Sequence, residues 1–212
     1  MSPRTPKPSG RRVRDKPFDS CTDLARRPGG SRVEQTSFLI LCEGKTEKLY
    51  FTGMRTRRGP QLAVDAPDRD HLGVVREAIA RRTDEYDEVW CVLDTELDEA
   101  LVTEIVREAC AGGVKLALSS PCFEVWLILH HEVCAAPFQS AEQAKKKLAQ
   151  VLPGWSETTT RFADFKKGVQ DACQRARPLS GDADDLLQNP STNVWRLAEL
   201  ILNPPNETQR GF

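Results

Sequence analysis

Short apolar runs alternate with segments of helical periodicity along the first half of the sequence. Four runs have the length of β-strands: SFLILC from Ser37, QLAVDA from Gln61, EVWCVLD from Glu88 and VKLALS from Val114. Between them, residues 46–58, 71–82 and 97–113 place apolar side chains three or four positions apart, which predicts helices. Strands that alternate with helices favour a mostly parallel sheet with helices on both faces. The pattern therefore predicts an α/β fold.

The second half of the sequence has a helical pattern. Ser120 and Pro121 are predicted to be the N-cap and first turn of a helix over CFEVWLILHH, and further helices are expected at 140–151, 161–176 and 193–202. Residues 1–36 mix Pro, Gly, Ser and Arg without sustained periodicity, which indicates a basic, flexible arm. We predict an α/β core over 37–120, a helical completion of the same domain over 121–205, and a tail over 206–212.

Charge and composition add limits to this picture. The formal net charge is −1, but residues 1–32 hold nine Lys or Arg against three Asp, so the arm could lie along nucleic-acid phosphates or act as a solubilising segment. The longest apolar run, residues 125–129, is far shorter than the roughly 20 residues of a membrane span. The seven cysteines show no CxxC pair, and most of them are expected to be reduced core residues. We predict a cytoplasmic protein with no membrane contact.

Four acidic residues follow two of the predicted strands. Glu43 comes directly after FLILC, and Asp94 ends EVWCVLD, with Glu96 and Asp98 within the next turn. Each acid alone could be a helix cap. However, ligands of a parallel sheet bind beyond the carboxyl ends of its strands, where acids distant in sequence can converge. Since Mg²⁺ and Mn²⁺ prefer oxygen ligands, we predict a divalent-metal site formed by these four acids.

Four motifs in this order resemble the signatures of RloB-like proteins: LILCEGKTEKLYF, VWCVLDTELD, SPCFEVWLILHH and NPSTNVWRLAELI, over roughly residues 32–205. That family is similar to the Toprim fold, the metal-binding α/β module of topoisomerases, primases and OLD-type nucleases. On this resemblance Glu43 matches the Toprim glutamate, and Asp94 and Glu96 match the two acids of its Asp-x-Asp motif. The chain departs from the pattern at Glu96, where aspartate is expected, and at His131, where an aromatic residue is usual. The longer Glu96 side chain can alter the geometry around Mg²⁺, so Asp98 is a candidate substitute.

Six further residues are candidates for chemistry or substrate binding. Glu124 and His130 match polar positions of the family motif and are candidate catalytic residues, with His130 able to shuttle a proton or orient a phosphate, although helix packing also explains them. Four residues are candidates for contacts with substrate phosphates: Lys45 and Thr46 at a predicted helix start, and Lys166 and Lys167 after RFADF. A solvated turn or helix face is the alternative for these four.

The resemblance implies a metal-dependent nuclease that acts in antiphage defence. An RNA substrate such as tRNA is favoured over DNA, by analogy with other Toprim defence proteins. The alternative is a non-catalytic subunit that binds nucleic acid or a partner ATPase of a defence cassette. A nucleotidyl-transfer role is less well supported, because the sequence shows no polymerase-like segment. A homo-oligomer is compatible with either function.

Overall fold

The computed structural model describes residues 35–180 and 188–204, which belong to one compact unit that starts at Gln35. The predicted basic arm lies outside the described residues except for positions 35 and 36, and the predicted tail over 206–212 lies wholly outside them.

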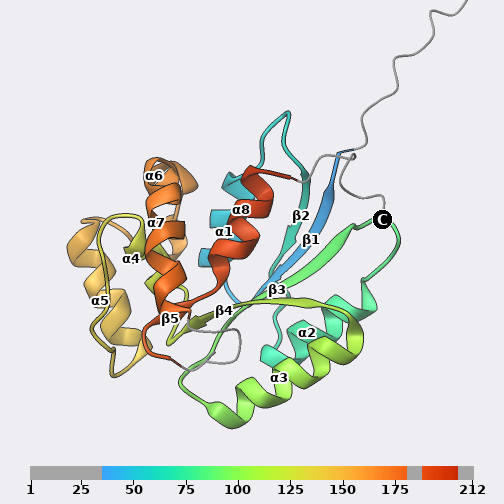
Figure 1. The fold of residues 1–212 in the computed structure, drawn as a ribbon, viewed down its shortest axis with the longest axis horizontal. Coiled ribbons are helices and arrows are strands. Elements are labelled where there is room, and N and C mark those ends of the chain that lie inside the picture. The colour runs from blue at the N-terminus through green and yellow to red at the C-terminus, as the bar shows by residue number, and fades with distance from the viewer. Residues whose placement is uncertain (1–34, 181–187, 205–212) are drawn as a thin grey trace, which may run out of the picture. The chain divides into compact units, whose positions relative to one another are not determined.

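Five strands form one sheet in the order β2-β1-β3-β4-β5 (Figure 1). Their bounds are β1 Ser37–Cys42, β2 Gln61–Asp65, β3 Glu88–Asp94, β4 Lys115–Ser120 and β5 Ser191–Thr192. The first four strands pair in parallel, and β5 pairs antiparallel with β4. The predicted mostly parallel α/β fold is confirmed, including all four predicted strands. The two-residue strand β5 was not predicted, because a segment of two residues is too short to show the alternating pattern of a strand.

The buried strands separate two hydrophobic cores. Phe38, Ile40 and Cys42 of β1 belong to one core, and Leu39 and Leu41 belong to the other. Successive strand residues point to opposite faces, so a continuous apolar run is what a strand covered on both faces requires. The six described cysteines are free and five of them are buried, which agrees with the prediction of reduced core residues.

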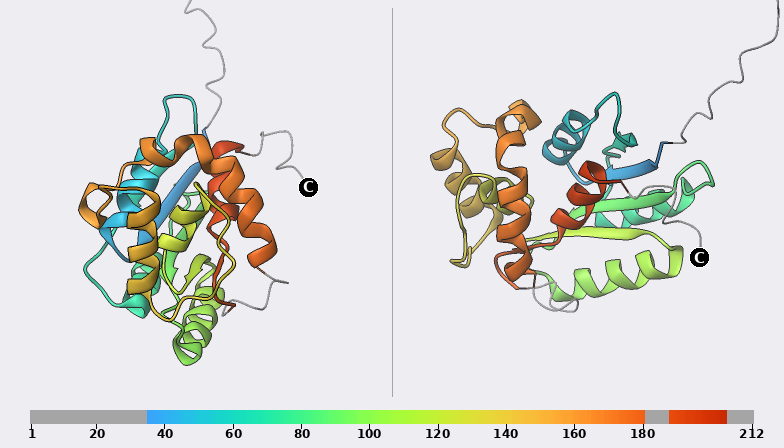
Figure 2. Two further views of the ribbon diagram at one scale, coloured as in Figure 1. Left: turned by 90° about the vertical axis from the view of Figure 1, so that its left-hand side faces the viewer. Right: turned by 45° about the horizontal axis from the view of Figure 1, so that its top comes forward.

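Helices cover both faces of this sheet, as Figures 1 and 2 show. The helix bounds are α1 Lys45–Gly53, α2 His71–Ala80, α3 Glu99–Gly112, α4 Glu124–Leu129, α5 Ala141–Val151, α6 Phe162–Phe165, α7 Val169–Ala176 and α8 Val194–Leu202. Apolar residues of α2 and α3 pack in the core of one face, whereas α1 and α4 to α8 contribute to the core of the other face. Within residues 35–180 and 188–204, none of the helices has the length and apolar content needed to cross a bilayer.

Two helix predictions in the second half were wrong in detail. Ser120 and Pro121 are joined by a cis peptide bond, and α4 starts only after its N-cap residue Phe123. The single helix predicted over 161–176 is divided into α6, a 3-10 turn at Lys166–Gly168, and α7. At Gly168 an added Cβ would lie 2.1 Å from the carbonyl oxygen of His130, so the backbones of α7 and α4 approach too closely for a side chain.

Candidate metal centre

The site lies where the sheet reverses its winding order. From β1 the chain passes through α1 to β2, whereas from β3 it passes through α3 to β4 on the other side, and α1 and α3 cover opposite faces. The loops after β1 and β3 therefore diverge at the carboxyl ends of these neighbouring strands, where open α/β sheets characteristically bind ligands. We call this place between the two strand ends the crevice. Glu43 and Asp94 stand at this point. Their position is the one that the sequence pattern predicted.

A direct hydrogen bond joins the two strand ends. The backbone N–H of Glu43 donates to the carbonyl oxygen of Val92 at 3.1 Å, which extends the pairing of β1 with β3. The backbone N–H of Asp94 in turn donates to Oε2 of Glu43 at 3.1 Å. Oδ1 of Asp94 accepts from the backbone N–H of Phe123 at 2.8 Å, so the start of α4 is held against the same crevice.

His71 and Glu96 bring two more metal-ligating groups to the Glu43 carboxylate. One ligand atom each of Glu43, His71 and Glu96 lies within 4.8 Å of the others. Nε2 of His71 is 3.0 Å from Oε2 of Glu43, and the His71 side chain is only 12% exposed. Sequence reasoning missed His71. It is the first residue of α2, after β2, and the rule that strand ends gather ligands would have drawn attention to it.

Glu96 and Asp98 have different places in the loop after β3. Glu96 is exposed, has the left-handed φ of 49° and contributes to the three-residue group with Glu43 and His71. Asp98 is the N-cap of α3, and its side chain accepts from the backbone N–H of Leu101 at 3.0 Å. Asp98 is thus engaged in the capping role that the alternative interpretation gave it, and neither Asp98 nor Asp94 is part of that group.

Glu47, Asp94 and Glu124 form a set of desolvated carboxyl groups around the crevice. Glu47 and Glu124 are buried, with 6% and 3% exposure. Burial, together with the charges of Glu124 and Glu43, raises the pKa of Glu47 to about 7. Burial also raises the pKa of Asp94 well above its usual range, with added repulsion from Glu47, Glu43 and Glu124. Desolvation likewise raises the pKa of Glu124.

Sequence reasoning also missed Glu47. It lies four residues after Glu43 in the first turn of α1, where its Oε2 accepts from the backbone N–H of Gly44 at 3.1 Å. An acid in the first turn of a helix is ordinarily explained as a cap. Glu47 makes this capping contact, but its burial and its repulsion by other acids go beyond what a cap requires, and these are tertiary properties.

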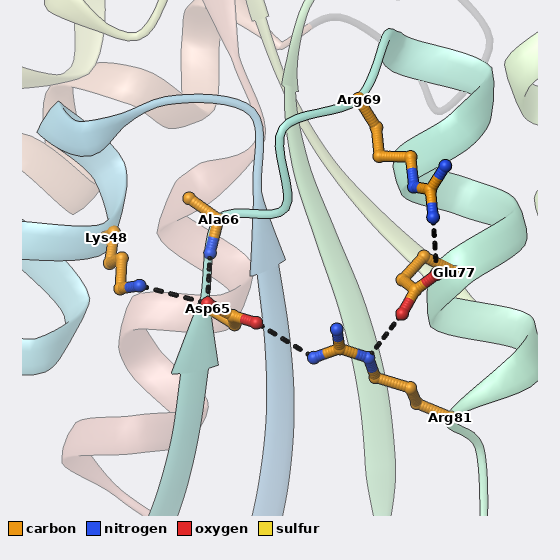
Figure 3. A network of polar contacts seen from close by, with 6 residues as sticks. All are labelled: Lys48, Asp65, Ala66, Arg69, Glu77 and Arg81. Carbon is orange, nitrogen blue, oxygen red and sulfur yellow. Dashed lines mark hydrogen bonds and ion pairs between the residues drawn. The ribbon is translucent and has the colours of Figure 1, made fainter.

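An ion-pair network at the end of β2 shows how this chain neutralises an acid elsewhere (Figure 3). Asp65 accepts from Lys48 Nζ and from Arg81, both at 2.9 Å, and these bonds lower the pKa of Asp65 to about 2. Arg81 also donates to Glu77 at 2.7 Å, and Arg69 completes the network at 3.9 Å from Glu77. Acid and base are therefore balanced in this neighbouring cluster.

The acids of the crevice have no such balance. In the part of the chain that the structure describes, no Lys or Arg forms an ion pair with Glu43, Glu47 or Asp94. Lys145 is near enough to lower the pKa of Glu124, but its ammonium group forms its ion pair with Glu157, at 2.7 Å. Carboxylates gathered without a Lys or Arg partner, together with the imidazole of His71, are a donor set that suits a divalent metal ion.

His130 has a structural role in the core. Its Nδ1 lies 2.8 Å from the carbonyl oxygen of Trp126, which can only accept, so Nδ1 carries the proton. Nε2 then accepts from the Tyr50 hydroxyl at 2.9 Å. Burial lowers the pKa of His130 to about 3, so the ring is neutral at physiological pH. With both nitrogens engaged and 5% exposure, His130 does not fit the predicted role of proton shuttle.

The four predicted phosphate contacts are dispersed. Lys45 is the exposed first residue of α1, whereas Thr46 beside it is buried. The Glu47 carboxylate already accepts one N–H at this helix start, which opposes the binding of an anion there. Lys166 and Lys167 are exposed on the 3-10 turn between α6 and α7, and the structure brings neither into ion-pair contact with the acids of the crevice.

Comparison with known families gives one result. The sequence model of a family described as RloB-like protein matches residues 38–201, which covers most of the chain. This range includes both strand ends, α2 and α4, and therefore every residue of the crevice. Searches among curated proteins and among solved structures gave no match.

Proposed function

This chain belongs to the RloB-like family, and we propose that it is a metal-dependent nuclease whose active site is the crevice between β1 and β3. One observation carries the proposal: Glu43, Glu47, Asp94 and Glu124 converge at the switch point of the sheet with no Lys or Arg paired to the first three among the described residues. Gathering carboxylates at a place where two of them, Glu47 and Glu124, are buried is costly unless protons or a cation neutralise them. A divalent ion is the cation that such oxygen donors select.

Each residue has a chemical task in this proposal. Glu43 and Glu96 would hold the ion, with Asp94 at the neighbouring strand end and Glu47 neutralised beside them. When bound, a divalent ion supplies Lewis-acid activation of a phosphodiester and of the attacking water. Glu124 is the group to which we assign proton transfer at its carboxylate oxygens, because it is buried beside the other acids and burial raises its pKa above the usual value. Lys145 is near enough for its charge to lower the pKa of Glu124, and it would stabilise the negative charge of the phosphate.

The substrate and setting rest on the resemblance. RNA such as tRNA is favoured over DNA, and a role in antiphage defence is proposed, both by analogy with Toprim-type defence proteins. The exposed Lys45, Lys166 and Lys167 are available for contacts with the nucleic-acid backbone. A partner ATPase from a defence cassette is a candidate activator.

Cleavage assays test the proposal directly. The full chain is incubated with labelled tRNA, single-stranded RNA and plasmid DNA in Mg²⁺, Mn²⁺ or EDTA, with and without a partner ATPase. We expect cutting that needs metal and is lost in Glu43→Gln and Asp94→Asn. Glu142→Gln is the matched control, because Glu142 is an exposed acid in the first turn of α5. If every substrate stays intact in all conditions, the nuclease assignment is wrong, and binding without cutting would indicate a non-catalytic subunit.

A further inference from the structure

His71 is an unusual neighbour for the acids of the crevice. Toprim-type sites are expected to bind metal through carboxylates, yet here an imidazole nitrogen lies 3.0 Å from the central Glu43 carboxylate. The three contributing residues come from three elements: the turn after β1, the start of α2 and the loop after β3. Such convergence of distant segments is a tertiary arrangement and not a consequence of one turn or cap.

The His71 nitrogen has no aligned hydrogen-bond partner. Nε2 is buried and lies 3.0 Å from Oε2 of Glu43, a contact that raises the pKa of His71, although among the described residues Nε2 forms no contact with the alignment of a hydrogen bond. A buried polar atom left in this way is costly, and each such atom in a folded protein calls for a partner. A bound metal ion would be such a partner and would displace the proton that His71 otherwise shares with Glu43, because neutral imidazole binds metals through this lone pair.

The spacing of the donor atoms suits a single ion. Metal–ligand distances of about 2.0–2.3 Å place two ligands of one ion roughly 3 to 4.5 Å apart. The donor atoms of Glu43, His71 and Glu96 lie within 4.8 Å of one another, so small side-chain rotations bring them to these distances. Glu96 is exposed and has the freedom to make this adjustment.

We propose that His71 is a direct nitrogen ligand of the metal, so that Glu43, His71 and Glu96 form a mixed site selective for transition ions such as Mn²⁺ or Co²⁺ over Mg²⁺. This inference rests on the proposed metal-dependent function and specifies the class of metal. Imidazole suits first-row transition ions, whereas Mg²⁺ prefers an all-oxygen octahedron. Glu96 is one methylene longer than the aspartate expected at this position. This length fits the assignment, since the Glu96 carboxylate reaches the group that includes the imidazole.

Pulsed electron paramagnetic resonance of the Mn²⁺-loaded full chain tests the proposal without measuring activity. The protein is prepared without a polyhistidine tag, because it contains only three histidines of its own, His71, His130 and His131. We expect the spin echo to show ¹⁴N modulation from a coordinated imidazole. The modulation is expected to vanish in His71→Gln and to persist in His131→Gln, whose residue is exposed at the end of α4.

Titration calorimetry gives the second readout. His71→Gln is expected to raise the dissociation constant for Co²⁺ at least about tenfold, which is the size of loss that altered metal sites typically show. The dissociation constant for Mg²⁺ is expected to change less than about threefold. The wild-type spectrum is decisive even if the variant does not fold. Bound Mn²⁺ without ¹⁴N modulation overturns the assignment of His71 and leaves a carboxylate metal site intact. Nitrogen modulation in a protein that cuts no nucleic acid supports the ligand but overturns the nuclease.

Discussion

Ionisation of Glu47 is expected to destabilise the metal-free protein. Burial raises the pKa of this carboxyl group from 4.5 to about 7. One pKa unit corresponds to about 1.4 kcal/mol, so the shift amounts to about 3 kcal/mol of unfolding free energy. For a chain of this size that is a change in melting temperature of roughly 6–12 °C.

The direction of the pH dependence follows from proton binding. Between pH 4.5 and about 7 the folded state keeps the Glu47 proton that the unfolded state has lost, so stability falls as the pH rises through this window. Asp94 and Glu124, with raised pKa values, act in the same direction. His130 acts in the opposite direction, because its pKa is lowered to about 3 and stability is lost as the pH falls from 6.5 toward 3. The two windows overlap.

Comparison with Glu47→Gln separates these contributions. Urea unfolding in EDTA is measured at pH 4.5, 5.5, 6.5 and 7.5 for both proteins, and the effect of His130 is common to both. Glutamine keeps an oxygen that can accept from the Gly44 N–H. As the pH rises from 4.5 to 7.5, we expect the unfolding free energy of the variant to increase by about 3 kcal/mol relative to that of wild type. Glu142→Gln, which changes an exposed acid, should show a constant difference.

Metal addition provides the complementary measurement. At pH 7.5 a saturating divalent ion should raise the melting temperature of wild type by more than it does at pH 5.5, because protons and metal compete for the same carboxylates. A buried group with a raised pKa must make stability depend on pH. A difference in unfolding free energy between wild type and Glu47→Gln that varies by less than about 0.5 kcal/mol over the whole pH range would refute the reasoning.

Three further substitutions test individual contacts. Asp98→Ala should lower the unfolding free energy measured in urea by about 1 kcal/mol, because the Leu101 N–H loses its cap. Asp98→Asn should lose much less, and equal losses in the two variants would contradict the capping role. Tyr50→Phe removes the hydroxyl that donates to His130 Nε2 and should cost about 1–3 kcal/mol, and an unchanged unfolding midpoint would show that this bond contributes nothing. Gly168→Ala places a Cβ 2.1 Å from the His130 carbonyl oxygen and should lower the melting temperature sharply; a variant as stable as wild type would contradict the close approach.

Local pattern was sufficient to predict the parallel sheet and the position of its two acidic strand ends. Buried parallel strands are continuously apolar, and the residue at which each run breaks marks the edge where ligands gather. For this reason Glu43 and Asp94 could be placed beside each other from sequence alone, and the structure joins them by a hydrogen bond. The start and end of α3 were also encoded locally, in the Asp98 cap and in Gly113, whose φ of 66° suits glycine.

The tertiary structure alone decided which other residues join those acids. His71 looks like an ordinary first residue of a helix, and only the pairing of β2 with β1 and of β1 with β3 brings its nitrogen to Glu43. Glu47 looks like a cap until packing buries it among acids, and His130 looks like a catalytic residue until both nitrogens meet core partners. Periodicity reports the face of an element, whereas burial, charge repulsion and hydrogen-bond partners depend on contacts between segments far apart in the sequence.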